Sequence, residues 1–230
     1  MIRRLLCPLL VAVGMVLASV SIAPTAHAAP WVKNAQTRLN ALGCDSGPAD
    51  GRIGDHTRSA VLRFQSRHGL PQSGTFTDKT RRTLASTKRR CDVRPVPARS
   101  GTGRRLVLSQ GQNWLWLVRA NGTVAAQGGF IDNPSALRGM TGQVGSYCGR
   151  TAKIKRNYSS GGLVLANFVR WQACGVGFHR IPQYTSGQQI HPDWMLGTNM
   201  RESHGCIRLS AGLSQKVWDF AGIGTRVRVV

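Results

Sequence analysis

One cysteine lies in a short segment whose neighbours could activate it as a nucleophile. Residues 203–208 read Ser-His-Gly-Cys-Ile-Arg, with the cysteine at position 206. A cysteine attacks as its thiolate, so it needs a neighbouring base or a positive field that lowers the pKa of the thiol. His204 within the segment and His179 upstream are the candidate bases. A Cys-His pair by itself also fits a structural role with a buried free thiol, so nucleophilic thiol chemistry at Cys206 is one of two interpretations that the pattern leaves open.

Other residues of the segment could stabilise the charges of such a reaction. Arg208 and Arg201 would add positive potential beside the thiol. Gly205 would let the backbone approach a substrate carbonyl closely. The amides of Gly205 and Cys206 could then donate hydrogen bonds to the oxyanion that develops on that carbonyl.

These residues lie in a region patterned for β-strands. Short apolar runs predict strands at 106–108, 114–118, 123–126, 163–169 and 176–178. Asn121-Gly122 predicts a hairpin turn, and an apolar face over 211–221 predicts a helix, followed by a last strand at 225–230. We therefore expect a mainly-β, mostly antiparallel domain over residues 106–230, large enough for its own core.

The region before it is patterned for helices. Val32, Ala35, Leu39 and Leu42 recur at helical spacing, residues 60–64 repeat the stripe, and a third short helix follows Asp78. Glycines mark the turns between them. Residues 31–87 are thus expected to form a small all-α module of three helices, whose small core would need a covalent staple.

Two further segments have simpler compositions. Residues 88–105 contain prolines, glycines and serine among arginines, which is typical of an extended linker. Residues 1–28 have the features of a secretory signal peptide: Arg3 and Arg4, an apolar stretch, and Ala-His-Ala at 26–28 as the cleavage site. The alternative is an uncleaved anchor, because the apolar stretch is just long enough to span a bilayer.

The cysteines fit an exported protein. Of the six cysteines, Cys7 lies in the signal peptide, so five remain in the mature chain. Thiols of exported proteins tend to oxidise in pairs. Sequence does not fix the connectivity, but proximity within the two regions favours Cys44–Cys91 and Cys148–Cys174, with Cys206 free.

The charge balance is strongly basic because acidic residues are scarce. Lys and Arg number 31 against 9 Asp and Glu, a formal net charge of +22, and Glu202 is the only glutamate. A basic exported protein meets anionic wall polymers, although the charge could equally be a solvated arginine-rich surface. We expect no nucleic-acid partner and no stable membrane anchoring once the signal is cleaved. The single glutamate excludes chemistry that needs a pair of glutamates.

The Ser-His-Gly-Cys-Ile-Arg string, followed by Leu209-Ser210 and preceded by Gly197 and by Phe178-His179, closely resembles the L,D-transpeptidase (YkuD) catalytic domain. The resemblance covers about residues 104–230 and implies a β-sandwich-like domain whose cysteine attacks a peptidoglycan stem peptide. It implies that Cys206 is the nucleophile and His179 the general acid and base, with a backbone carbonyl beside it, such as that of Arg180, as third member.

The resemblance also implies roles for the rest of the string. His204 is an active-site residue, and Ser203, Gly205 and Arg208 are expected to contact substrate or oxyanion. The spacing from His179 to Cys206 is long because of an insertion containing His191-Pro192-Asp193-Trp194. His191 is therefore the alternative base, although we favour His179, which ends a strand, and expect His191 on a lid or exposed at the surface.

The first region resembles the peptidoglycan-binding type 1 domain over residues 31–87. The matching residues are core and turn positions: Val32, Gln36, Leu39, Leu42-Gly43, Asp50-Gly51, Gly54, Thr57, Ala60-Val61, Phe64-Gln65, Gly69-Leu70, Gly74 and Leu84. The resemblance implies a three-helix module that binds peptidoglycan, but it identifies no residues that contact the glycan.

Together these observations predict an exported wall enzyme without metal or cofactor that acylates Cys206 on a tetrapeptide stem and forms 3→3 cross-links. Hydrolysis of the same thioester would make it an L,D-carboxypeptidase. Two other classes are a zinc peptidase, which His179, His191, His204 and Cys206 would serve, and a non-enzymatic wall-binding protein. Against zinc, the chain has no His-x-x-x-His pair. Against a binding protein, the nucleophile string is intact.

Overall fold

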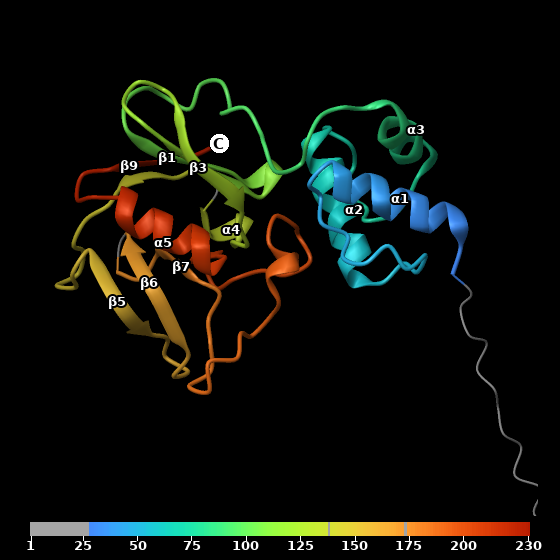
Figure 1. Ribbon diagram of the computed structural model, residues 1–230. Coiled ribbons are helices and arrows are strands. Elements are labelled where there is room, and N and C mark those ends of the chain that lie inside the picture. Colours follow the sequence, from blue (N-terminus) through green and yellow to red (C-terminus); the bar gives the residue numbers. More distant parts are fainter. Residues whose placement is uncertain (1–27, 138, 173) are drawn as a thin grey trace, which may run out of the picture.

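Three helices form one unit and two β-sheets form another (Figure 1). The computed structural model describes residues 28–137, 139–172 and 174–230. The expected signal peptide therefore lies, except for Ala28, outside the described residues. Among the described residues, none of the helices is both long and apolar enough to cross a bilayer.

The first unit contains the three predicted helices, α1 (Pro30–Ala41), α2 (Asp55–Arg67) and α3 (Asp78–Ser86). Pro30 starts α1 at a position where its missing N–H costs nothing. The Thr77 hydroxyl accepts a hydrogen bond from the Thr80 amide and caps α3. The apolar stripes meet in one core, which the Cys44–Cys91 disulfide closes.

The second unit has a five-stranded sheet in the order β3-β2-β1-β9-β4. Neighbouring strands are antiparallel except β1 and β9, which are parallel and join the two ends of this unit. The strands are β1 (Arg105–Ser109), β2 (Trp114–Val118), β3 (Val124–Gly129), β4 (Thr141–Gln143) and β9 (Arg226–Val229).

A four-stranded sheet in the order β5-β6-β7-β8 stands beside it. Its pairs are antiparallel except β7 and β8, which are parallel. The strands are β5 (Lys153–Tyr158), β6 (Val164–Arg170), β7 (Gly177–Arg180) and β8 (Ile207–Leu209).

The main core lies between the sheets and is completed by the predicted C-terminal helix, α5 (Ala211–Phe220). The Ser210 hydroxyl caps α5 by accepting from the Leu213 amide. The helix contacts β6, β7 and β3, so its apolar face covers both sheets. Leu213 and Val217 on that face are buried. The chain is therefore a three-helix module followed by a mainly-β domain with two sheets, as the sequence predicts.

The sequence analysis missed short or polar elements. It did not predict β5, whose residues Lys-Ile-Lys-Arg-Asn-Tyr are largely polar because the strand lies at the edge of its sheet. It also missed β4, β8 and the short helices α4 (Pro134–Leu137), η1 (Gln110–Gln112) and η2 (Asp193–Met195). Three or four residues are too few to show a period.

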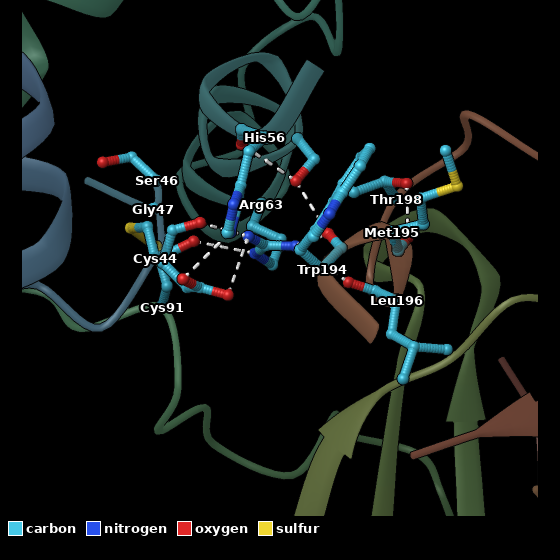
Figure 2. A network of polar contacts seen from close by, with 12 residues as sticks. Cys44, Ser46, Gly47, His56, Arg63, Cys91, Trp194, Met195, Leu196 and Thr198 are labelled. Atoms are coloured by element: carbon cyan, nitrogen blue, oxygen red, sulfur yellow. Dashed lines mark hydrogen bonds and ion pairs between the residues drawn. A yellow bond between two sulfur atoms is a disulfide. The ribbon is translucent and has the colours of Figure 1, made fainter. Parts of the chain in front are cut away.

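The two units are joined by a buried arginine on α2 (Figure 2). Arg63 is only 6% exposed, and its guanidinium donates to backbone carbonyls of both units. Within its own unit it donates to Cys44 O (2.8 Å) and Asp45 O (2.6 Å). Across the interface it donates to Trp194 O (2.5 Å) and Leu196 O (3.1 Å). Burial lowers the pKa of Arg63 to about 10, so the group stays charged at neutral pH.

Neighbouring contacts complete this interface. The Ser59 hydroxyl donates to Trp194 O at 2.7 Å. The His56 ring stacks on the Trp194 indole with 5.3 Å between centroids, and Figure 2 labels both residues. On its other side the inserted segment lies against β3, where a Cβ at Gly129 would come within 2.6 Å of Gly197 N. The insertion is therefore held between the helical unit and the larger sheet.

Residues 88–105, expected as an extended linker, include a second buried arginine. Arg94 is 1% exposed and donates to Cys91 O, the Ser66 hydroxyl, Arg63 O and Gln112 O. It also lies over the Trp114 ring, 4.1 Å from the centroid. This part of the segment is therefore packed between the units rather than extended into solvent.

Replacing Arg63 with methionine is expected to lower the free energy of unfolding by about 3 kcal/mol, because four backbone carbonyls lose a charged donor and two of these hydrogen bonds are fully buried. Chemical denaturation followed by tryptophan fluorescence measures the change. Arg58→Met is the matched control, since Arg58 is exposed on the same helix. Equal stability of the two variants would show that Arg63 does not stabilise the interface.

Candidate active site

The cysteine segment forms a tight turn that ends in β8. The Ser203 hydroxyl donates to Cys206 O (2.6 Å) and accepts from the Gly205 amide (2.9 Å). Gly205 has φ of 134°, a backbone conformation that side chains disfavour, which explains a glycine next to the nucleophile. The Asp132 carbonyl accepts from the Ser203 amide and ties the turn to the segment that follows β3.

Strand pairing brings His179 to this turn. In the parallel pair of β7 and β8, His179 is opposite Arg208. Side chains alternate along a strand, so Cys206, two residues before Arg208, lies toward the same face. Twenty-six residues separate His179 from Cys206 in sequence, and only this pairing brings them together.

The environment of His179 fixes its tautomer and its charge. The side chain is 2% exposed, and Nδ1 lies 2.5 Å from Arg180 O, the carbonyl expected from the sequence. A carbonyl only accepts, so Nδ1 carries the proton and Nε2 has a free lone pair. Burial lowers the pKa of His179 to about 4, with the charge of Arg208 adding to the effect. The imidazole is neutral at pH 7 and can accept a proton.

Cys206 is the one free cysteine of the described residues, and burial raises the pKa of its thiol. Sγ lies 3.3 Å from Gly175 O, to which the thiol donates. Burial raises the pKa of Cys206, while a backbone hydrogen bond from Gly177 and the charges of Arg170 and Arg208 lower it. Burial has the largest effect on this pKa. The positive charges expected from the sequence are present, but they lower the pKa of the thiol by less than burial raises it.

This balance has a measurable consequence: the alkylation rate of Cys206 by iodoacetamide should still rise above pH 9, because the thiolate is the reactive form. Intact mass against pH gives the rate, with glutathione as the control thiol. The protein thiol should react more slowly than glutathione at pH 7. A titration midpoint below pH 8 would contradict this assignment.

A cavity of about 730 Å³ opens over the thiol. All six residues expected at the site line it: His179, Ser203, His204, Gly205, Cys206 and Arg208. His204 is exposed at this cavity, whereas His179 is buried in its wall. The Ser203 hydroxyl and the Gly205 amide bond to one another, so of the two amides expected at an oxyanion the Cys206 amide is the remaining candidate.

His191, the alternative base, does not lie where the sequence analysis expected. It is 5% exposed, and its Nδ1 lies 3.2 Å from Pro192 O. It is not among the residues that line the cavity. The apolar residues closest to it in sequence, Ile190 and Trp194, pack against a buried cluster formed by Ile131, Ile181, Met195 and Leu196.

The sequence analysis missed residues on the opposite wall. Arg150, Arg170 and Gly175 line the cavity, and the Cys148–Cys174 disulfide joins the two loops that carry Arg150 and Gly175. The spacing of the two cysteines suggested the disulfide, but nothing in the sequence placed it beside the thiol. Over the described ranges, no three His, Cys, Asp or Glu side chains gather as a metal site would require.

Comparison with known families agrees with this geometry. The model of the L,D-transpeptidase catalytic domain matches residues 100–229, more than half of the chain. The chain belongs to the L,D-transpeptidase family. The model of a putative peptidoglycan binding domain matches residues 29–84, which contain the three helices.

Several solved structures are similar to this L,D-transpeptidase family member. The L,D-transpeptidase of Xylanimonas cellulosilytica (residues 123–326) is 24% identical, with 88% of this chain and 94% of that one covered and a TM-score of 0.47. The L,D-transpeptidase of Stackebrandtia nassauensis is 20% identical over 88% and 92%, with a TM-score of 0.46.

A third structure carries a different name. A fused Zn-dependent amidase/peptidase/peptidoglycan-binding domain-containing protein of Clostridium acetobutylicum is 18% identical over 88% and 96%, with a TM-score of 0.41. No curated protein matches the chain.

Proposed function

We propose that this protein is an exported cysteine L,D-transpeptidase that acts on tetrapeptide stems of peptidoglycan. Cys206 attacks the carbonyl of the third stem residue, D-Ala leaves, and a thioester forms. The amine of a second stem then attacks the thioester and produces a 3→3 cross-link. The observation that carries the proposal is that Cys206, the free thiol, lies in one cavity with a neutral histidine whose Nε2 can accept a proton.

His179 would move one proton through both half-reactions. Its Nε2 takes the proton from the Cys206 thiol as sulfur bonds to the carbonyl carbon. The imidazolium then gives this proton to the nitrogen of the departing D-Ala. In the second half-reaction Nε2 takes a proton from the attacking amine and returns it to the sulfur. The Nδ1 hydrogen bond to Arg180 O would hold the ring in this tautomer throughout.

The raised pKa of the thiol fits this sequence of steps. A thiolate paired with an imidazolium before substrate binds would require a charged, buried His179, which the low pKa of the imidazole disfavours. Proton transfer is therefore expected to accompany attack rather than precede it. The oxyanion would take its hydrogen bond from the Cys206 amide, with Arg208 contributing positive charge.

The helical module supplies the second part of the proposal. It would bind peptidoglycan and, because Arg63 and Arg94 fix it to the catalytic domain, hold the wall in a defined orientation to the active site. Two disulfides and the expected signal peptide support a location outside the cytoplasm, in the wall. The net charge of +22 would favour contact with anionic wall polymers.

The test is to incubate residues 29–230 with a tetrapeptide muropeptide, follow the intact mass, and separate the products by chromatography. An adduct on Cys206 that decays to cross-linked stems supports transpeptidation. An adduct that yields only shortened tripeptide makes the enzyme an L,D-carboxypeptidase. If wall binding is intact but no adduct and no product form, both activities are contradicted, and the result favours a binding protein.

A further inference from the structure

The cavity over Cys206 is strongly cationic. Arg150, Arg170 and Arg208 line it, and the described residues of its wall include neither aspartate nor glutamate. Three positive charges in one partly enclosed cavity repel one another. Such an arrangement indicates a ligand that brings negative charge.

Two of these arginines serve the nucleophile. The positive charges of Arg170 and Arg208 act on the Cys206 thiol and favour its thiolate. The charge of Arg150 acts instead on Arg170, and Arg150 is not among the groups that shift the pKa of the thiol. The chemistry of the thiol therefore does not account for Arg150.

The backbone of Arg150 is nevertheless fixed by its turn and by a neighbouring disulfide. Residues 147–150 form a tight turn in which the Tyr147 and Arg150 amides each donate to the other residue's carbonyl, at 3.2 and 3.0 Å. Both central residues, Cys148 and Gly149, have positive φ (54° and 69°), as a type I′ turn requires. The disulfide to Cys174 then fixes this turn to the loop that contacts the thiol.

The guanidinium that this turn presents is free to bind. Within the described part of the chain, the Arg150 side chain donates no hydrogen bond and forms no ion pair. Arg170 beside it uses Nε on Thr151 O and Nη1 on Cys174 O, and its second terminal nitrogen remains for a ligand. Planar guanidinium groups bind carboxylates through paired hydrogen bonds.

We propose that Arg150, with Arg170 beside it, forms a carboxylate-binding subsite that selects stems whose third residue ends its side chain in a free carboxylate. The inference rests on the proposed function. In a tetrapeptide stem the carboxylate of the fourth residue lies next to the scissile bond, near the arginines that flank the sulfur. A carboxylate at the end of the third side chain lies several bonds farther from the scissile bond, and Arg150 is the cavity arginine that does not act on the sulfur. A side chain ending only in an ammonium would be repelled.

The experiment compares three tetrapeptide stems that differ only at the end of the third side chain. The first ends in an amine and a free carboxylate, the second in the amine and the corresponding carboxamide, and the third, lysine, in the amine alone. The rate of Cys206 acylation is measured by intact mass on the full mature chain. The first stem should react about tenfold faster than the second, because the loss of one charged hydrogen-bond pair corresponds to about a tenfold change in affinity. The lysine stem should react slowest.

Variants assign this preference to Arg150. Arg150→Ala should reduce the tenfold ratio between the first two stems to about one, and Arg150→Lys should give an intermediate ratio. Arg226→Ala, which removes the same charge from an exposed position on β9, should keep the tenfold ratio. Iodoacetamide alkylation of Cys206 checks that each variant keeps its fold around the thiol.

The failures are distinguishable. Equal rates for the carboxylate and carboxamide stems in the wild-type protein would overturn the subsite while leaving the transpeptidase intact. A tenfold ratio that persists in Arg150→Ala would overturn the assignment to Arg150. No acylation by any of the three stems would overturn the proposed function and this inference with it.

Discussion

Replacing Cys206 with alanine is expected to abolish acylation by tetrapeptide stems, with a fall in rate of about 10⁴-fold or more. No other free thiol exists among the described residues, and the other four cysteines there are joined in two disulfides. Without the sulfur there is no thioester, so neither cross-linked nor shortened stems should form. Intact mass after incubation with substrate measures the adduct, and chromatography measures the products.

The control for this variant is its structure and its wall binding. The site of the change lies in the cavity wall, remote from the three helices, so the melting temperature and the binding to isolated wall should match those of the wild-type protein. Products formed at an undiminished rate by Cys206→Ala would show that the reaction uses another nucleophile. A chelator that stops the wild-type reaction would point instead to a metal.

Replacing His179 with glutamine is expected to lower the acylation rate by about 10²- to 10⁴-fold, the usual contribution of a general base. Glutamine can still donate to Arg180 O from its side-chain amide, but it has no nitrogen that accepts a proton. His191→Gln is the comparison, because His191 was the competing base and lies buried beside the site. His191→Gln should lower the acylation rate by less than tenfold. A larger loss with His191→Gln than with His179→Gln would reverse the assignment.

The pH profile of the wild-type enzyme tests the same assignment. The imidazole of His179 must be neutral to accept the thiol proton, and burial lowers its pKa to about 4. The acylation rate should therefore stay level from neutral pH down to about 5 and fall as the pH passes through 4, because the ring becomes protonated. A fall centred near pH 6.5 would show that the base is an exposed histidine. His179→Gln should remove the fall altogether.

The interface between the two units changes how wall binding would serve catalysis. A flexible tether would raise only the effective concentration of substrate near the active site. Here the carbonyls of Trp194 and Leu196 bind Arg63 of the helical module, and Ile190 of the same insertion lines the cavity. The module is thus part of the scaffold on which the cavity is built.

The sequence by itself determined the local features of this protein. The apolar spacing of residues 32–42 and 60–64 predicted helices, because a helical period of 3.6 is visible wherever one face is buried. The Ser-His-Gly-Cys-Ile-Arg segment predicted a nucleophilic cysteine, because its residues lie within a single turn and contact one another there. Proximity within each unit favoured the two disulfide pairs that the structure contains, without fixing them.

Only the tertiary structure decided which distant residues meet. His179 is joined to the cysteine segment by the parallel pairing of β7 and β8, and no local pattern sets the register of strands that an insertion separates. His191 is buried rather than exposed, although the sequence analysis expected it on a lid or at the surface.

Three arginines also depend on the tertiary structure for their different environments. In sequence Arg63, Arg94 and Arg150 look alike, as members of a basic surface. In the fold Arg63 and Arg94 are buried because carbonyls from both units satisfy their donors, while the Arg150 guanidinium is left free at the cavity over Cys206. A charged side chain is buried at acceptable cost only where hydrogen-bond acceptors surround it, and here those acceptors come from several separate segments of the chain.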